Sequence, residues 1–221
     1  MMWLILILSF LIKLPFCGKP MVGYFGSYQA INAMMGQMMV HGPWQNFLAP
    51  RTFVLFNGEP SFHLIYYPLG AFFAALLKLL MGGNLVFWGH FQSAVFMAAS
   101  GLIFYDLVLK IHGKEIARTA LLVFCFLPMN LAMGISLQNE SVALFFLLAA
   151  TRLVLSAGVL SAFMAGILFS VALTARLHFL SLLPLFFYFW FSEKKKPYHF
   201  FLFLMGVIIP VALCFGYFYT V

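Results

Sequence analysis

Long continuous runs of apolar residues, separated by short polar turns, recur along this chain. A helix that crosses a bilayer needs about 20 mostly apolar residues, so the pattern predicts an all-α, polytopic membrane helical bundle. We expect about seven spans, at Met2–Phe16 and at about 86–109, 119–136, 141–157, 159–174, 177–192 and 199–219. The polar turns between these spans then predict which way each one runs.

Basic residues gather in two of the polar turns and predict the orientation of the bundle. One turn holds Lys110, Lys114 and Arg118, and the other is the lysine run 194–196. Because cytoplasmic loops are rich in Lys and Arg, we expect both turns to face the cytoplasm. Four spans between the turns satisfy that parity and place Arg152 on the same side.

This orientation leaves residues 17–85 as a long extracytoplasmic loop, followed by the helical bundle of residues 86–221, within one transmembrane domain. A connection of that length usually contains structure of its own. Apolar residues at helical spacing over 31–39 predict an amphipathic helix at the membrane interface, with its methionines as adaptable packing. The stretch 64–80 predicts a second helix of the surface or re-entrant kind. If that stretch spans instead, the topology on one side of it is inverted.

The composition supports a membrane protein and argues against one kind of partner. Hydrophobic residues make up 65% and charged residues 8% of the 221 residues, with a mean hydropathy of +1.05, which excludes an ordinary soluble globule. Orientation and contact with anionic lipid explain the net charge of +7, so no nucleic-acid partner is expected. Cys17, Cys125 and Cys214 are far apart in sequence and are expected to be packing residues. Lys13 is expected to snorkel from a retained first helix to the interface.

Three phrases of the sequence, taken in order, resemble a known family. They are FNGEPSFHLIYYPLGAFFAALLKLL, YDLVLKIHGKEIARTALL and LPMNLAMGISLQNESVALFFLLAATRL. Their order is similar to the N-terminal membrane half of the GT-C glycosyltransferases, in the branch of the aminoarabinose and protein O-mannosyl transferases. The resemblance implies a multi-pass protein of the bacterial inner membrane that takes a sugar from a polyprenyl-phosphate donor on the outer face. It also leaves room for a partner membrane subunit and a divalent cation, although no metal site is predicted.

The chain departs from that family at one position that matters for chemistry. The family places an Asp-Glu pair in the first outer loop, as a base or to activate the acceptor, whereas this chain has Phe25 and Gly26 there. The resemblance therefore requires another base or a non-catalytic role. It places Tyr28 and Gln29, which follow, among the substrate-binding residues. Glu140, in LQNESVALFF, matches a position where the family often carries an acid at the outer mouth of a span.

Transfer from a phosphate-linked sugar requires a base for the acceptor hydroxyl and a cation for the leaving phosphate. Few residues on the expected outer side can supply these groups. The candidate bases are Glu59, Glu140 and His63, with His41 as a further base or metal ligand, and the candidate phosphate ligands are Arg176, Arg51 and Lys78.

Several of these residues also have a structural interpretation. Arg176 can anchor a helix end at headgroup level, and Glu59 can be a solvated turn residue before Pro60. Glu140 can cap the start of a helix, and His63 can be an interfacial histidine without a ligand.

Three functions follow from the sequence. The first is a lipid-linked-sugar glycosyltransferase, or its membrane half, with an active site between the outer loop and the mouths of the spans. The second is a non-catalytic protein of the same fold that binds a polyprenyl lipid or assists a partner, which the missing acidic pair favours. The third, a small transporter, ranks last because the sequence places almost no charged or polar residues near mid-bilayer.

Overall fold

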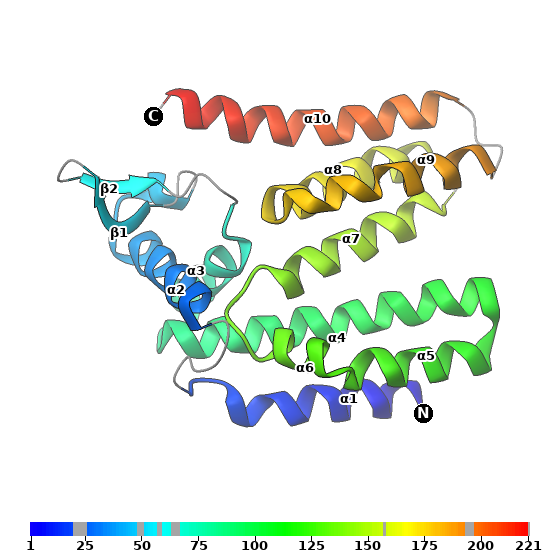
Figure 1. Cartoon of the computed structure of the whole chain (residues 1–221), viewed down its shortest axis with the longest axis horizontal. Helices are drawn as coiled ribbons and strands as arrows, with labels where there is room; N and C mark the ends of the chain where they lie inside the picture. The colour runs from blue at the N-terminus through cyan, green and yellow to red at the C-terminus, as the bar shows by residue number, and fades with distance from the viewer. Residues whose placement is uncertain are drawn as a thin grey trace. The chain divides into compact units, whose positions relative to one another are not determined.

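The computed structural model describes residues 1–19, 26–47, 51–56, 59–62, 67–156, 158–192 and 197–220, with only the backbone described at 51–56, 59–62, 189–192, 197 and 213–220. The chain forms two compact units, Met1–Val142 and Ala143–Val221, and each is described by itself. Both units consist mainly of helices (Figure 1), which confirms the helical bundle predicted from the sequence.

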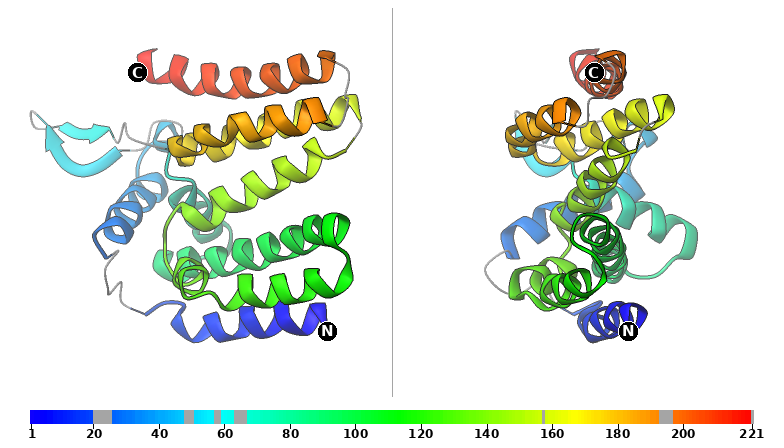
Figure 2. Two further views of the ribbon diagram at one scale, coloured as in Figure 1. Left: turned by 45° about the vertical axis from the view of Figure 1, so that its right-hand side comes forward. Right: turned by 90° about the vertical axis from the view of Figure 1, so that its right-hand side faces the viewer.

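Three helices lie side by side in the first unit, α1 (Met2–Lys13), α4 (Leu85–His112) and α5 (Lys114–Phe126) (Figure 1, Figure 2). A short 3-10 helix, η1 (Leu14–Phe16), extends α1. The turn between α4 and α5 is closed by Gly113 at φ 82°, a conformation that glycine adopts without a steric penalty. The basic turn predicted from the sequence therefore joins α4 to α5. Side chains of α1 and α5 form one apolar cluster with Ile5, Leu6, Leu121 and Cys125.

The predicted span 119–136 is not one straight helix. Helix α5 ends at Phe126, and α6 (Pro128–Gly134) continues at an angle of 59° to it. Proline has no N–H to donate to the preceding turn and its ring clashes with that turn, so Pro128 begins a new helix. Residues 135–139 then lead without regular structure into α7 (Glu140–Val154).

The two helices of the predicted outer loop belong to the core of the first unit. Helices α2 (Gly26–His41) and α3 (Leu69–Met81) pack against each other and against α4. Met35 and Met39 are buried in this part of the fold, so the methionines pack as expected but against protein rather than along a lipid surface. Gly36 permits the close approach, because a Cβ there would lie 2.8 Å from the Leu85 side chain.

A short β-hairpin, which the all-α prediction lacks, follows the 3-10 helix η2 (Trp44–Phe47). Strands β1 (Arg51–Phe56) and β2 (Glu59–Phe62) pair antiparallel, with Arg51 opposite Phe62 and Phe56 opposite Glu59. The sequence between the strands is Asn57-Gly58, which is the strongest short signal for a hairpin. That dipeptide could have predicted the element.

The second unit is built on α8 (Val159–Ala175) and α10 (Pro197–Thr220), which pack along each other (Figure 2). The 3-10 helix η3 (Leu177–Leu182) and α9 (Leu183–Ser192) follow α8 in the chain. Gly166 and Gly206 meet at the crossing, where a Cβ on Gly206 would overlap the carbonyl oxygen of Phe163. Glycines at such crossings let two helix backbones approach closely.

Lys13 does not snorkel as the sequence predicted. Its side chain is fully buried, and Nζ donates hydrogen bonds to Ser9 O at 2.9 Å and Ser9 Oγ at 2.6 Å. Snorkelling needs a path from the helix to water, and the packing of α1 against α4, α5 and α6 closes that path. The interior of the first unit therefore contains an amine that the sequence pattern had assigned to the interface.

Large apolar side chains are exposed on the outer faces of the helices, among them Ile7 and Leu11 of α1, Val123 of α5 and Ile208 of α10. By length and composition, α4 can cross a membrane, and the bent pair α5–α6 is a second such segment if it forms one span. The other apolar helices, counted over the residues whose side chains are described, are shorter. One of them is α3, whose 13 residues rise about 20 Å.

Candidate functional site

Buried polar groups of the first unit gather around the connection from α6 to α7. Its residues Ser136, Leu137, Gln138 and Asn139 are each at least about nine-tenths buried, although they form no regular structure. A buried backbone N–H or C=O must find a hydrogen-bond partner, because leaving it unpaired costs free energy. The Gln138 N–H bonds to Ser136 O at 2.9 Å within the connection, whereas the backbone of Leu137 depends on side chains of a neighbouring helix.

Two amide side chains of α2 hold the backbone of Leu137. The Leu137 N–H donates to Gln29 Oε1 at 3.3 Å, and Asn32 Nδ2 donates to Leu137 O at 3.3 Å. Gln29 and Asn32 are one helical turn apart on the same face of α2 and are both buried. The sequence predicted Gln29 as a substrate ligand, and the geometry assigns its amide oxygen to this backbone contact.

Asn139 fixes the other end of the connection to α3. Its Oδ1 accepts a hydrogen bond from the Gly70 N–H at 2.9 Å, and its Nδ2 donates to Tyr67 O at 3.1 Å. Gly70 lies so close that a Cβ would be 2.6 Å from Gln138 O. The start of α3 and the start of α7 are thereby joined through one buried amide.

His90, in the second turn of α4, completes the cluster. Its Nδ1 lies 3.1 Å from Phe16 O and its Nε2 lies 3.3 Å from Gln29 Oε1. Both neighbours are hydrogen-bond acceptors, since the Leu137 N–H already donates to Gln29 Oε1. A neutral imidazole can donate to only one of them, so protonating His90 adds a hydrogen bond to the site.

Three buried polar atoms beside the connection have no hydrogen-bond partner among the described residues. They are Asn32 Oδ1, Gln138 Nε2 and Ser141 Oγ. Buried polar atoms are nearly always paired, so a group of unpaired ones indicates a bound molecule or water. We name the set Gln29, Asn32, His90, Gln138, Asn139 and Ser141, together with the Leu137 backbone, the polar cluster.

Glu140 stands directly beside the polar cluster. It is the first residue of α7 and is half-buried. A carboxylate in the first turn lies at the positive end of the helix dipole, which favours its negative charge. Its position suits both the helix-capping and the general-base interpretations of the sequence.

The remaining predicted residues are distributed more widely. Tyr28 is exposed, and its carbonyl accepts a hydrogen bond from Asn32 Nδ2 at 3.1 Å. Lys78 of α3 donates to Gln37 Oε1 at 3.2 Å, and His41 is exposed at the end of α2. Arg176 is the half-buried residue that ends α8 in the second unit.

Three predicted site residues fall outside what the structure describes. The side chains of Arg51 and Glu59 are not described, and His63 lies outside the described residues altogether. Their proposed roles stay predictions from the sequence.

The sequence analysis missed Asn32, His90, Gln138 and Asn139 as members of one site. The available signal was the occurrence of amide and imidazole side chains at the ends of apolar runs, where a lipid-facing helix end would not require them. Nothing in the sequence, however, brings α2 beside the α6–α7 connection, which is about a hundred residues away along the chain.

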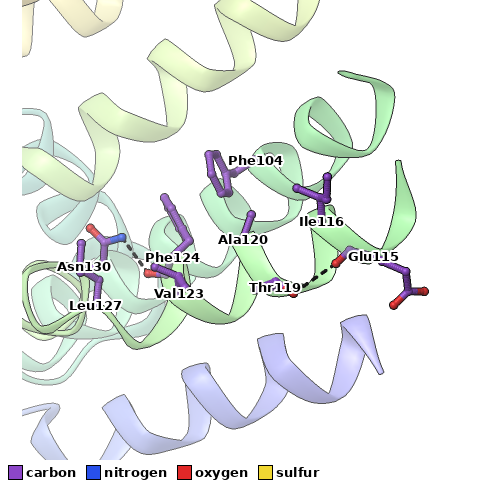
Figure 3. A pocket seen from close by; sticks show the side chains of 9 residues that line it. All are labelled: Phe104, Glu115, Ile116, Thr119, Ala120, Val123, Phe124, Leu127 and Asn130. Atoms are coloured by element: carbon purple, nitrogen blue, oxygen red, sulfur yellow. Dashed lines mark hydrogen bonds between the residues drawn. The ribbon is translucent and has the colours of Figure 1, made fainter. Parts of the chain in front are cut away.

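A groove of about 710 Å³ lies elsewhere on the first unit, along α4, α5 and α6 (Figure 3). Its lining is mostly apolar, with Phe104, Val123 and Phe124 among the residues. Two of its polar side chains are already occupied: Thr119 Oγ1 donates to Glu115 O at 3.3 Å, and Asn130 Nδ2 donates to Phe124 O at 2.7 Å. The groove therefore suits an apolar chain and offers little for catalysis.

Comparison with known proteins adds no family to this description. No family model, curated protein or solved structure matches the chain. Among the residues that the structure describes, no group of three His, Cys, Asp or Glu side chains is arranged to hold a metal ion.

Proposed function

We propose that this chain is a multi-pass membrane protein, with the seven spans predicted from the sequence, that acts as a glycosyltransferase or its membrane half. Its donor is a sugar carried on polyprenyl phosphate at the extracytoplasmic face. The observation that carries the proposal is the polar cluster, with Glu140 beside it, at one end of a helix whose other end is basic.

The length of α4 supports an extracytoplasmic position for the polar cluster. The helix has 28 residues and rises about 42 Å, with His90 in its second turn and Lys110 in its last. These two residues are about 30 Å apart along the helix, which is about the thickness of the hydrocarbon core. Because Lys110, Lys114 and Arg118 favour the cytoplasm, the polar cluster falls at the opposite face.

The distribution of polarity supports a membrane setting for more than α4. Exposed side chains on the described parts of α1, α8 and α10 are largely apolar, whereas the interior of the first unit holds amides, an imidazole and an amine. In water the reverse arrangement is the rule. Helices shorter than 20 residues cross as parts of a bundle when they tilt little or when the bilayer thins around them.

The proposed chemistry assigns roles to two residues of the first unit. Glu140 accepts the proton of the acceptor hydroxyl. The acceptor oxygen then bonds to the anomeric carbon as the bond from that carbon to the phosphate oxygen breaks, and polyprenyl phosphate leaves. Lys78, the cation on α3, neutralises the phosphate. The unpaired amide and hydroxyl groups of Asn32, Gln138 and Ser141 are suited to sugar hydroxyls.

The alternative is a non-catalytic protein of the same kind that binds a polyprenyl lipid. The observation in its favour is that the polar cluster itself contains neutral amides, a hydroxyl and one imidazole, which bind hydroxyls but, apart from the imidazole, cannot take up a proton. In this alternative the same site binds the lipid but catalyses no transfer.

Purified protein in lipid nanodiscs, supplied with a panel of radiolabelled polyprenyl-phosphate sugars, tests these functions. Glu140→Gln is expected to lower turnover at least 100-fold while leaving donor binding within threefold, because general-base catalysis contributes about 10²–10⁴-fold. Glu115→Gln is the matched control, since Glu115 is exposed and paired with Arg118 at the basic end. Arg176→Ala tests one of the two other cations that the sequence predicted, the second being Arg51.

The outcomes separate the two functions. Equal turnover in wild type and Glu140→Gln excludes Glu140 as the base. Donor binding without turnover in the wild type favours the non-catalytic protein, and no binding of any donor contradicts both functions.

The orientation has its own test. Single cysteines at Met81 and Lys114, placed in a chain whose native cysteines are replaced, are expected to react with membrane-impermeant maleimide from opposite sides. Labelling of both from the same side contradicts the proposed placement of α4 across the membrane.

A further inference from the structure

A buried junction links α1 to both sides of the bend between α5 and α6. It consists of Ser9, Lys13, Cys125 and Gly134. The Lys13 side chain runs against Gly134, the last residue of α6, where a Cβ would lie 2.5 Å from Lys13 Cε. Glycine at 134 therefore leaves the space that the lysine fills.

Hydrogen bonds also connect Lys13, through Ser9, to α5. Lys13 Nζ donates to the carbonyl and the hydroxyl oxygen of Ser9, and Ser9 Oγ donates to Cys125 O at 3.4 Å. Cys125 is the second-last residue of α5, one turn before the bend at Pro128. The junction thus holds the residues on each side of the 59° bend.

Packing alone does not require an amine at this position. Lys13 is fully buried, and no described carboxylate forms an ion pair with it. Burying an amine costs free energy that an apolar side chain of the same length does not cost, and an ionisable group inside a membrane helix bundle usually serves a function.

The position of the junction suggests what that function is. Residues 135–139 begin directly after Gly134, and they supply the Leu137 backbone and the Gln138 and Asn139 side chains of the polar cluster. These residues form their hydrogen bonds to Gln29, Asn32 and Gly70 only if the end of α6 has the correct position and direction.

We propose that Lys13 is a positioning residue, which fixes the end of α6 and so holds residues 135–139 in the geometry of the polar cluster. The role of the polar cluster in donor binding rests on the proposed function, whereas the positioning itself does not. Lys13 makes the contact that keeps this irregular, buried segment in place.

Hydrogen exchange measured by mass spectrometry on the full chain in nanodiscs tests the positioning. Lys13→Met keeps the length of the side chain and removes the amine. We expect exchange in peptides covering 135–141 to rise at least tenfold, with the melting temperature unchanged or higher. Lys110→Met is the matched control, because Lys110 is exposed and paired with Asp106, and it should leave this exchange unchanged.

Two results overturn the proposal. One is unchanged exchange at 135–141 in Lys13→Met. The other is a lower melting temperature with exchange raised throughout the first unit, because Lys13 is then a structural residue without a local role.

A second pair of variants tests the contact with Gly134. Gly134→Ala is expected to lower the melting temperature and to raise exchange at 135–141, because its Cβ displaces the lysine. Lys13→Ala/Gly134→Ala should recover the melting temperature but not the protection. Full recovery of protection in the double variant contradicts a role for the amine.

Donor binding is measured separately on the same proteins. If the wild type binds no polyprenyl-phosphate sugar while Lys13→Met still loses protection at 135–141, the proposed function fails and the positioning role stands. If the wild type binds donor and Lys13→Met binds it equally despite lost protection, the positioning has no part in donor binding.

Discussion

The two units of this protein are both helical, yet their interiors are made differently. The second unit is packed around Phe169, Phe186 and Phe203, whose ring centroids lie 4.8–5.8 Å apart. Among its described residues the buried polar side chains are Ser170 and His199. The first unit buries an amine, an imidazole and several amides. A helix bundle needs none of these to pack, and the proposed function uses the buried polar groups of the first unit.

The comparison also shows two ways to bring helices together. In the second unit, Gly166 and Gly206 remove side chains so that two regular helices approach. In the first unit, Gly70 and Gly134 make room for an irregular connection and for a lysine. Close packing therefore serves stability in one unit and places polar groups in the other.

The largest effect is expected from breaking the close crossing of the second unit. Gly206→Val places a side chain against the Phe163 carbonyl of α8 and is expected to destabilise the fold by about 3 kcal/mol or more, at the upper end of overpacking effects. Size-exclusion chromatography checks this prediction, because the fraction of monodisperse protein should fall. Met205→Val is the matched control, because Met205 is exposed, and equal behaviour of the two variants contradicts the crossing.

A smaller loss is expected from removing one buried amide of the first unit. Asn139→Leu leaves the Gly70 N–H without its partner and removes one of the hydrogen bonds to Tyr67 O, which also accepts from the Leu69 N–H at 2.9 Å. The loss costs about 2 kcal/mol. Thermal unfolding followed by circular dichroism measures the change. Asn84→Leu, at the exposed start of α4, removes an amide that only caps a helix and should cost about 1 kcal/mol. An effect of Asn139→Leu no greater than this control means that the buried amide is not essential to the fold.

Gln138→Met is expected to act in the opposite direction on stability. The Gln138 amide is buried and its Nε2 has no partner among the described residues, so an apolar side chain of similar size should stabilise by about 1 kcal/mol. Donor affinity should fall about tenfold if the amide binds a sugar hydroxyl, at about 1.4 kcal/mol. A stabilised protein with unchanged donor affinity removes Gln138 from the site.

The smallest effect is expected at a buried hydroxyl of the second unit. Ser170 Oγ donates to Ile167 O of its own helix at 2.8 Å, and a carbonyl in a helix already has a backbone partner. Ser170→Ala should change stability by less than about 0.5 kcal/mol, measured by the same thermal unfolding. A loss comparable with that of Asn139→Leu would show that both interiors depend on polar contacts.

The sequence by itself determined that the chain is helical and where most helices lie. The predicted span 159–174 corresponds to α8 and 86–109 lies within α4. Such helices can be predicted because an apolar run bounded by Gly, Pro or charged residues is recognisable in the local sequence. It also placed Glu140 at the start of a helix, since the run that follows is apolar.

Only the tertiary structure decided which polar residues meet. Gln29 and Asn32 reach Leu137 across more than a hundred residues of sequence, and Lys13 lies against Gly134, neither of which a local pattern records. The same apolar run fits a lysine that snorkels or one that is buried, because the neighbours that close its path to water come from α5 and α6. Periodicity specifies the face of a helix, whereas the partner of that face depends on how distant helices pack.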